Sequence, residues 1–382
     1  MTELDLLYSE VEEDLASAVR AVLADRCPPQ AVLARCEGPE PYDAGLWRVL
    51  AREVGVAALA VPEALGGAGA SWREAAVVME EAGRACAPVP FLGSAVLATS
   101  VLLDARDRGA DELAALAAGE RSATLAVPLS TAPDAPFPSG VRATGEGELT
   151  GSVRSVADAL TADLLIVPAD GPDGPGLYAV EAAAATVAAR GSLDLTRPLA
   201  DLELTGAPGR LLIGPDQADA VLFDALLTGA GLLASEQLGV AEWCLTTTVA
   251  YLRERRQFGR VVGSFQALKH RLADLWLDVA GARAAARAAA DALAAGSADA
   301  AVLVAVAASH CGSVAVRAAE EAVQLHGGIG MTWEHPVHLY LKRAKADQLA
   351  LGTPGRHRAT LATLAALPAP GGAGRLPRVP HT

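Results

Sequence analysis

The segment ADLLIVPADGPDGPGLYAVE, residues 162–181, decides the fold. Two short apolar runs, ADLLIVPA and GLYAVE, stand on either side of the turn-rich DGPDGPG. Runs of this length between clusters of Pro and Gly are typical of strands joined by loops. Three similar runs, ATLAVP, GELTGSV and ADLELTG, lie nearby. The sequence therefore predicts an antiparallel β domain with long loops over residues 122–216.

Helical patterns surround this domain. Apolar residues recur at helical spacing before it, at Leu46, Val49, Leu50 and Val54, and after it, at Leu268, Leu272, Leu275 and Val279. Ala-rich runs over 282–295 and 300–308 allow helices to approach closely. We expect an α+β protein with a helical domain over residues 1–121, the β domain over 122–216 and a helical bundle over 217–382. The Pro- and Gly-rich end from Pro368 is expected to fray.

Composition excludes several classes of protein. The chain has 382 residues, of which 52% are hydrophobic and 20% charged, as in globular proteins. A net charge of -14 argues against nucleic-acid binding, which needs a basic face. The N-terminus is acidic, unlike a signal peptide, and the longest apolar stretches, such as 300–308, are too short to cross a bilayer. We expect a soluble, cytoplasmic protein that is not bound to a membrane.

Cysteine and histidine spacing gives no metal site. The five cysteines are far apart and form no CxxC pair, which favours reduced thiols in the core. His335 and His338 could share a helical face, but no cluster of carboxylates or thiols accompanies them. Packing or surface roles are therefore expected for both histidines.

Two segments of the last third have residues suited to an anionic ligand. In RERRQFGR, four arginines surround Phe258 and Gly259; guanidinium groups bind phosphate in bidentate fashion, and an aromatic ring can cover an adenosine. In QLHGGIGM, consecutive glycines would let backbone N–H groups approach a pyrophosphate. A solvated basic helix end and an ordinary helix C-cap explain the same residues, so each segment alone leaves both interpretations open.

Taken together, the motifs carry a family resemblance. The chain resembles the acyl-CoA dehydrogenase family in LWRVLAREVGVAALAVPEALGGAGAS, VVMEEAGRACAP, RERRQFG with Gln266 beyond it, and QLHGGIGMTWEHPV with a later LGT. The resemblance implies a helical N-terminal domain, a middle β domain and a C-terminal four-helix bundle, with FAD as cofactor and oligomers formed through the bundles. It also implies α,β-desaturation of an acyl-CoA, in which a glutamate removes the α-proton and the flavin accepts hydride.

The positions of the family's catalytic base are altered here. In most members the glutamate directly precedes a Gly-Thr, and Leu351 stands at that position. Some members carry it on an upstream helix, where this chain has Gly229, followed by Ala230 in place of a frequent arginine. A hydrocarbon side chain cannot accept a proton. No catalytic residue is therefore predicted at either position.

The segments that hold the flavin ring in the family also differ. The matching stretches are LAVPLSTAPDAPF from Leu125 and SVADALTADLL from Ser155. Pro128 has no backbone N–H to donate, and no tryptophan occurs between Trp72 and Trp243 to stack on the ring. The sequence thus predicts that the platform for the flavin ring is absent.

The residues that the family lends to a neighbouring subunit are kept. There, the FAD pyrophosphate and adenosine are partly held in trans by the neighbour's bundle. The matching positions here are Arg255, Gln257, Phe258, Gln266, Gln324, Leu325, Gly327 and Gly328. The chain keeps what it would contribute to a neighbour and lacks what it would need for itself.

Three hypotheses follow. The first is a non-catalytic subunit of a heteromeric acyl-CoA dehydrogenase, resembling actinobacterial steroid side-chain enzymes, with a homologous catalytic partner in an α2β2 assembly and an electron-transferring flavoprotein as acceptor. The second is a self-sufficient enzyme whose base is Glu236, with a pKa raised by apolar surroundings; a polar contact between helices is the ordinary explanation for Glu236, and Asp347 is expected to be a solvated helix residue. The third is a scaffold or acyl-CoA-binding protein without flavin.

Overall fold

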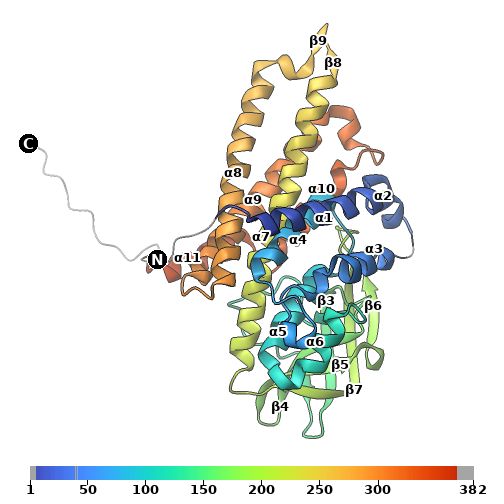
Figure 1. The fold of residues 1–382 in the computed structure, drawn as a ribbon, viewed down its shortest axis with the longest axis vertical. Helices are drawn as coiled ribbons and strands as arrows, with labels where there is room; N and C mark the ends of the chain where they lie inside the picture. The colour runs from blue at the N-terminus through green and yellow to red at the C-terminus, as the bar shows by residue number, and fades with distance from the viewer. Residues whose placement is uncertain (1–5, 39, 41, 368–382) are drawn as a thin grey trace, which may run out of the picture.

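A computed structural model describes residues 6–38, 40 and 42–367. The expected fraying of the tail from Pro368 lies outside these residues. Long C-terminal helices run along the longest axis of the molecule (Figure 1). The β-sheet lies at one end of this axis and a small β-hairpin at the other, and the N-terminal helices cross the middle.

The N-terminal region is helical, as predicted. Its α-helices are α1 (Glu10–Arg26), α2 (Pro29–Cys36), α3 (Ala44–Arg48), α4 (Trp72–Ala85), α5 (Thr99–Ala105) and α6 (Ala110–Ala117). Two π-helical segments, η1 (Val49–Val54) and η4 (Phe91–Ala98), and short 3-10 turns η2 (Val56–Ala58), η3 (Glu63–Leu65) and η5 (Arg106–Gly109) join them. Capping boxes begin α1 and α4: the Ser9 and Ser71 side chains accept backbone N–H groups, while Glu12 and Glu74 reach back.

The middle region is a sheet that closes on itself. Its strands are β1 (Ala123–Leu125), β2 (Val141–Ala143), β3 (Glu148–Ala157), β4 (Leu164–Gly171), β5 (Gly174–Glu181), β6 (Thr186–Arg190) and β7 (Leu199–Ile213), with the 3-10 turn η6 (Ala182–Ala184). The order β1-β4-β2-β3-β7-β5, with a further β4–β5 pairing, closes a ring of strands, and β6 pairs with β7. Most pairings are antiparallel, as predicted, but β4 runs parallel to β1 and β2.

The C-terminal region is a bundle of long helices. Its elements are α7 (Ala218–Glu254), α8 (Gln266–Ala294), α9 (Ala300–His326), α10 (Val337–Leu349) and α11 (Pro354–Leu364). The strands β8 (Arg256–Gln257) and β9 (Arg260–Val261) and the turn η7 (Val262–Ser264) separate α7 from α8, and the 3-10 turn η8 (Gly327–Met331) follows α9. Alanines over 282–292 of α8 are mostly buried, so small side chains bring the helices together.

Helices α4 and α7 pack backbone against backbone. A Cβ atom at Gly83 would lie 2.1 Å from the Glu236 carbonyl oxygen, and one at Gly239 would lie 1.9 Å from the Glu80 carbonyl oxygen. Only glycine fits such an approach. This contact fixes where α7 places the Glu236 side chain.

Two apolar cores support the fold. One runs continuously through the N-terminal helices, the bundle and one side of the sheet, and the other fills the interior of the strand ring with residues such as Leu149, Leu165 and Leu204.

Two helical segments, Ala218–Glu254 and Ala300–Met331, are long and apolar enough to span a membrane, so the expectation that the apolar stretches are too short is wrong. Their most apolar windows are 72% and 50% buried within the protein, as in core helices of a bundle.

Candidate functional site

Leu351 occupies a tight turn between α10 and α11. Its backbone is left-handed, with φ at 51°, and only 1% of the residue is exposed. The Leu351 N–H donates to the Leu129 carbonyl at 2.7 Å, and Nε2 of His357 lies 3.0 Å from the Leu351 carbonyl oxygen. A leucine rarely adopts this conformation. The turn therefore keeps the Leu351 side chain in the interior, although the left-handed backbone conformation is energetically unfavourable for leucine.

The fold brings Leu351 and Gly229 to one spot. A Cβ atom built on Gly229 would lie 3.0 Å from Cδ1 of Leu351 and 2.5 Å from Cδ2 of Leu97. The neighbouring Ala230 is also buried. The two positions at which the sequence predicts a missing base thus face each other, and hydrocarbon fills the space between them.

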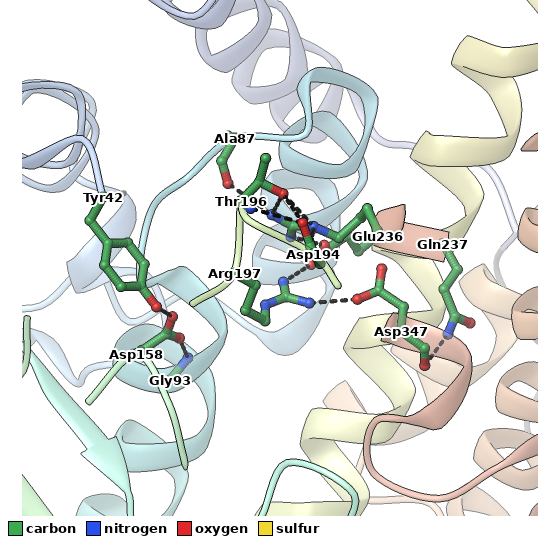
Figure 2. A network of polar contacts seen from close by, with 11 residues as sticks. Tyr42, Ala87, Gly93, Asp158, Asp194, Thr196, Arg197, Glu236, Gln237 and Asp347 are labelled. Atoms are coloured by element: carbon green, nitrogen blue, oxygen red, sulfur yellow. Dashed lines mark hydrogen bonds and ion pairs between the residues drawn. The ribbon is translucent and has the colours of Figure 1, made fainter. Parts of the chain in front are cut away.

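Glu236 does not lie among apolar side chains. Its two carboxylate oxygens are held by two buried arginines: Oε2 lies 2.6 Å from Nη2 of Arg197, and Oε1 lies 2.5 Å from Nη1 of Arg343 (Figure 2). Burial acts to raise the pKa of Glu236, but the two guanidinium groups outweigh it and hold the pKa below its ordinary value. The expectation of a raised pKa is therefore wrong, because the sequence does not show these partners.

Asp347 is a core residue. It is 1% exposed, and its Oδ1 lies 2.6 Å from Nη1 of Arg197. Burial, with the nearby Glu236 charge, raises the pKa of Asp347 well above its ordinary value. The expectation of a solvated helix residue is wrong, because α10 turns this face toward α7, where Gln237 donates to the Asp347 carbonyl at 3.0 Å.

A loop of the β domain completes this network. Asp194, before β7, lies 2.7 Å from Nε of Arg343, and its Oδ1 also accepts the Thr196 N–H at 2.8 Å. Arg197 follows in the same loop, and Figure 2 shows Asp194, Thr196 and Arg197 gathered beside Glu236 and Asp347. The network therefore ties the β domain to the bundle. Sequence reasoning missed Asp194, Arg197 and Arg343, since nothing in their local sequence marks them as partners.

The two segments expected to face a flavin ring are bonded to each other. The Leu129 N–H donates to the Ser155 carbonyl at 3.0 Å, while the Leu129 carbonyl accepts from Leu351. A Cβ atom at Gly352 would lie 3.1 Å from Cβ of Ala132. The backbone N–H and carbonyl groups of Leu129 are thus both used within the chain.

The arginine motif forms the hairpin β8–β9 at the far end of the bundle from the sheet (Figure 1). Phe258 stands at its tip with φ at 53° and is 88% exposed. Arg255, Gln257 and Gln266 are exposed as well. Guanidinium, amide and aromatic groups are therefore presented to the outside.

The glycine motif lies at the same end. Gln324, Gly327 and Gly328 are exposed in the last turn of α9 and in η8, whereas Leu325 is buried, so its side chain faces the core. The Tyr251 ring, in the last turn of α7, stacks on His326 at 4.6 Å between ring centroids. The stack joins the two motifs into one surface, the bundle-end surface, which consists of Arg255, Gln257, Phe258, Gln266, Gln324, Gly327 and Gly328. Sequence reasoning missed Tyr251 and His326.

His335 and His338 pack against aromatic rings. His335 lies 4.4 Å from the His326 ring and His338 lies 4.3 Å from the Trp333 ring, by centroids. Among the residues that the structure describes, no group of three or more His, Cys, Asp or Glu side chains is arranged to hold a metal ion.

Comparison with known proteins agrees with this architecture. Models of the acyl-CoA dehydrogenase N-terminal and C-terminal domains match residues 9–114 and 220–365. The chain is 38% identical over 350 residues to acyl-CoA dehydrogenase IpdE2 of Mycolicibacterium smegmatis, covering 91% of this chain and 96% of that protein. The chain belongs to the acyl-CoA dehydrogenase family, whose members are FAD-binding flavoproteins.

Two solved structures of similar proteins are steroid-type or two-component assemblies by title. The ChsE4-ChsE5 complex from Mycobacterium tuberculosis is 32% identical with a TM-score of 0.84, covering 96% of this chain and 100% of that one. A variant of the Tcur3481-Tcur3483 steroid acyl-CoA dehydrogenase is 31% identical with a TM-score of 0.83, covering 94% of this chain and 98% of that one.

Proposed function

We propose that this chain is the non-catalytic subunit of a heteromeric acyl-CoA dehydrogenase. A homologous partner would supply the base, the ring platform and the acyl-CoA pocket, in an assembly with two copies of each chain. The observation that carries the proposal is the contact of Leu351 with the Gly229 position, where hydrocarbon replaces a carboxylate. The ChsE4-ChsE5 complex supports the choice of a homologous partner.

FAD fits one part of this chain and not the other. Both backbone hydrogen-bonding groups of Leu129, in the segment expected to face the ring, are engaged within the chain, whereas the bundle-end surface offers exposed polar side chains. There Arg255 would pair with the diphosphate, Phe258 would cover the adenosine, and Gln324 with the N–H groups of Gly327 and Gly328 would bind phosphate or ribose oxygens. The flavin, when bound, supplies the hydride acceptor. This chain's residues would hold its ADP half.

The partner's substrate is proposed to be a bulky acyl-CoA with a steroid-derived side chain. The support is the printed title of the Tcur3481-Tcur3483 steroid enzyme and the similarity to it. We further propose that an electron-transferring flavoprotein receives the electrons and that the complex works in the cytoplasm. Desaturation of the thioester would take place wholly in the partner.

The geometry disfavours a self-sufficient enzyme with Glu236 as base. A carboxylate held by two guanidinium groups is a poor proton acceptor, because proton uptake would break two buried ion pairs.

The scaffold hypothesis differs from the proposed function in predicting a complex without flavin. Purified alone, the chain should be colourless; co-expressed with the homologous catalytic chain, it should give a yellow complex with half as many flavins as chains.

Controls separate the hypotheses. Arg255→Ala should lower the flavin content of the complex, because it removes a bidentate phosphate contact. Arg142→Ala, an exposed change of the same type in β2 of the sheet, is the matched control and should leave it unchanged. Full flavin occupancy in the Arg255→Ala complex would contradict the proposed role. A colourless complex that binds acyl-CoA would favour the scaffold.

A further inference from the structure

The two halves of the bundle-end surface meet at a pair of stacked rings. Tyr251 lies in the last turn of α7, and its carbonyl accepts the Arg255 N–H at 2.9 Å where the helix ends. His326 is the last residue of α9 and directly precedes Gly327. Their ring centroids are 4.6 Å apart with planes inclined by 27°. The stack is thus the point from which the arginine hairpin and the diglycine turn both start.

His326 is held in one orientation. It is 2% exposed, and Nδ1 lies 2.7 Å from the Ala322 carbonyl oxygen. A carbonyl can only accept, so Nδ1 carries the proton. Nε2 is buried and has no hydrogen-bond partner in the part of the chain that the structure describes. The His326 ring is therefore an uncharged aromatic surface. The His335 ring also packs against it, with 4.4 Å between the ring centroids.

The side chains of the surface need such a support. Arg255, Gln257 and Gln324 are exposed, and no hydrogen bond or ion pair of their side chains is found within the described residues. Their positions depend on the backbone behind them. A ligand bound by preformed groups avoids part of the ordering cost that loose groups would add.

We propose that Tyr251 and His326 are positioning residues that fix the spacing between the arginine hairpin and the diglycine turn, and so preorganise this chain to hold the ADP half of a flavin in the partner. The inference rests on the proposed function. The inference extends that function by assigning a role to Tyr251 and His326, which need not touch the cofactor.

Charge on the stack would undo this arrangement. The ionisable groups in ring contact with His326 are Tyr251 from α7 and His335 before α10. His338 on α10 acts in turn on His335, and Lys342 acts on His338. Burial lowers the pKa of His326, and burial together with His326 and His338 lowers that of His335. Both rings are neutral near pH 7. Acid would place positive charges on His326 and His335, whose rings are in contact, and their repulsion would displace His326 from its position.

The test is the rate of FAD release from the co-purified complex, followed by the fluorescence of free flavin. Tyr251→Leu removes the stack and should speed release about three- to tenfold, from the usual strength of aromatic pairs. Tyr251→Phe keeps the ring and should release FAD at the wild-type rate. Equal rates for the two variants would overturn the proposal.

A second variant covers the case in which Tyr251→Leu fails to fold. As the pH falls below about 6.5, the ordinary histidine pKa, release from the wild-type complex should accelerate, because the lowered pKa values of His326 and His335 place their protonation below it. His326→Phe keeps a stacking ring that cannot titrate, so its acceleration should be smaller. An identical pH profile would contradict the role of His326. Arg255→Ala tests the underlying function separately: if it releases FAD while the stack variants do not, the clamp stands and the positioning role fails.

Discussion

Leu351 and Gly229 lie in contact distance: a Cβ atom added to Gly229 would be 3.0 Å from the Leu351 side chain. One residue comes from the turn after α10 and the other from the first half of α7. Because both candidate positions for a base converge here, a carboxylate from either would reach the same place. In this chain the first position is a leucine and the second is a glycine, so neither carries a carboxylate.

Leu351→Glu is expected to destabilise the protein without creating a dehydrogenase. The carboxylate would enter an apolar site beside Leu97, and an unpaired buried charge costs several kcal/mol or forces protonation. Chemical denaturation measures the loss. Leu351→Met, which preserves volume, should cost less than about 1.5 kcal/mol. A Leu351→Glu chain that desaturates a thioester without a partner would contradict this prediction.

Gly229→Ala should overpack the core. The new methyl would lie 2.5 Å from Cδ2 of Leu97, well inside van der Waals contact, so we expect a loss of about 1–3 kcal/mol in the free energy of unfolding. Adding Leu97→Ala makes room for the methyl, so the double variant should be more stable than the sum of the two single losses predicts. Strict additivity of the two effects would show that the residues do not touch.

Glu236→Gln should damage stability and spare turnover. It leaves the Arg197 and Arg343 guanidinium groups with less negative charge in the core, and breaking a buried pair typically costs about 3–5 kcal/mol. Turnover of the assembled complex should stay unchanged at temperatures below the transition. Glu320→Gln, which removes an exposed pair with Lys345, is the control and should change stability by less than about 1 kcal/mol. Lost turnover with normal stability would revive Glu236 as a base.

Acid should weaken the fold through its paired glutamates. Arginines hold the pKa of Glu236 and Glu242 below the ordinary 4.5, although burial opposes them. A lowered native pKa gives stability that is complete above 4.5 and is lost as the pH falls through the native pKa. The melting temperature should therefore decline below about pH 4.5, and this decline should be shallower in Glu242→Gln. An equally steep decline would exclude Glu242 as a contributor.

The sequence predicts the strands whose apolar runs are long, such as β4 and β5, and the long helices. It does not predict β2 or β6, which are short; β6 lies at the edge of the sheet with mostly exposed residues, so no buried alternation marks it. Motif spacing located Leu351 and Gly229, but only the fold shows that they meet. The partners of Glu236 come from residues 39 and 107 positions away, so tertiary packing alone creates its environment.

The most direct measurement of the central proposal is flavin content together with turnover, for this chain alone and for its complex with the homologous catalytic chain. The proposal predicts a colourless, inactive protein alone and an active complex with one flavin for every two chains. A homo-oligomer of this chain that carries a full complement of flavin and desaturates an acyl-CoA would contradict it.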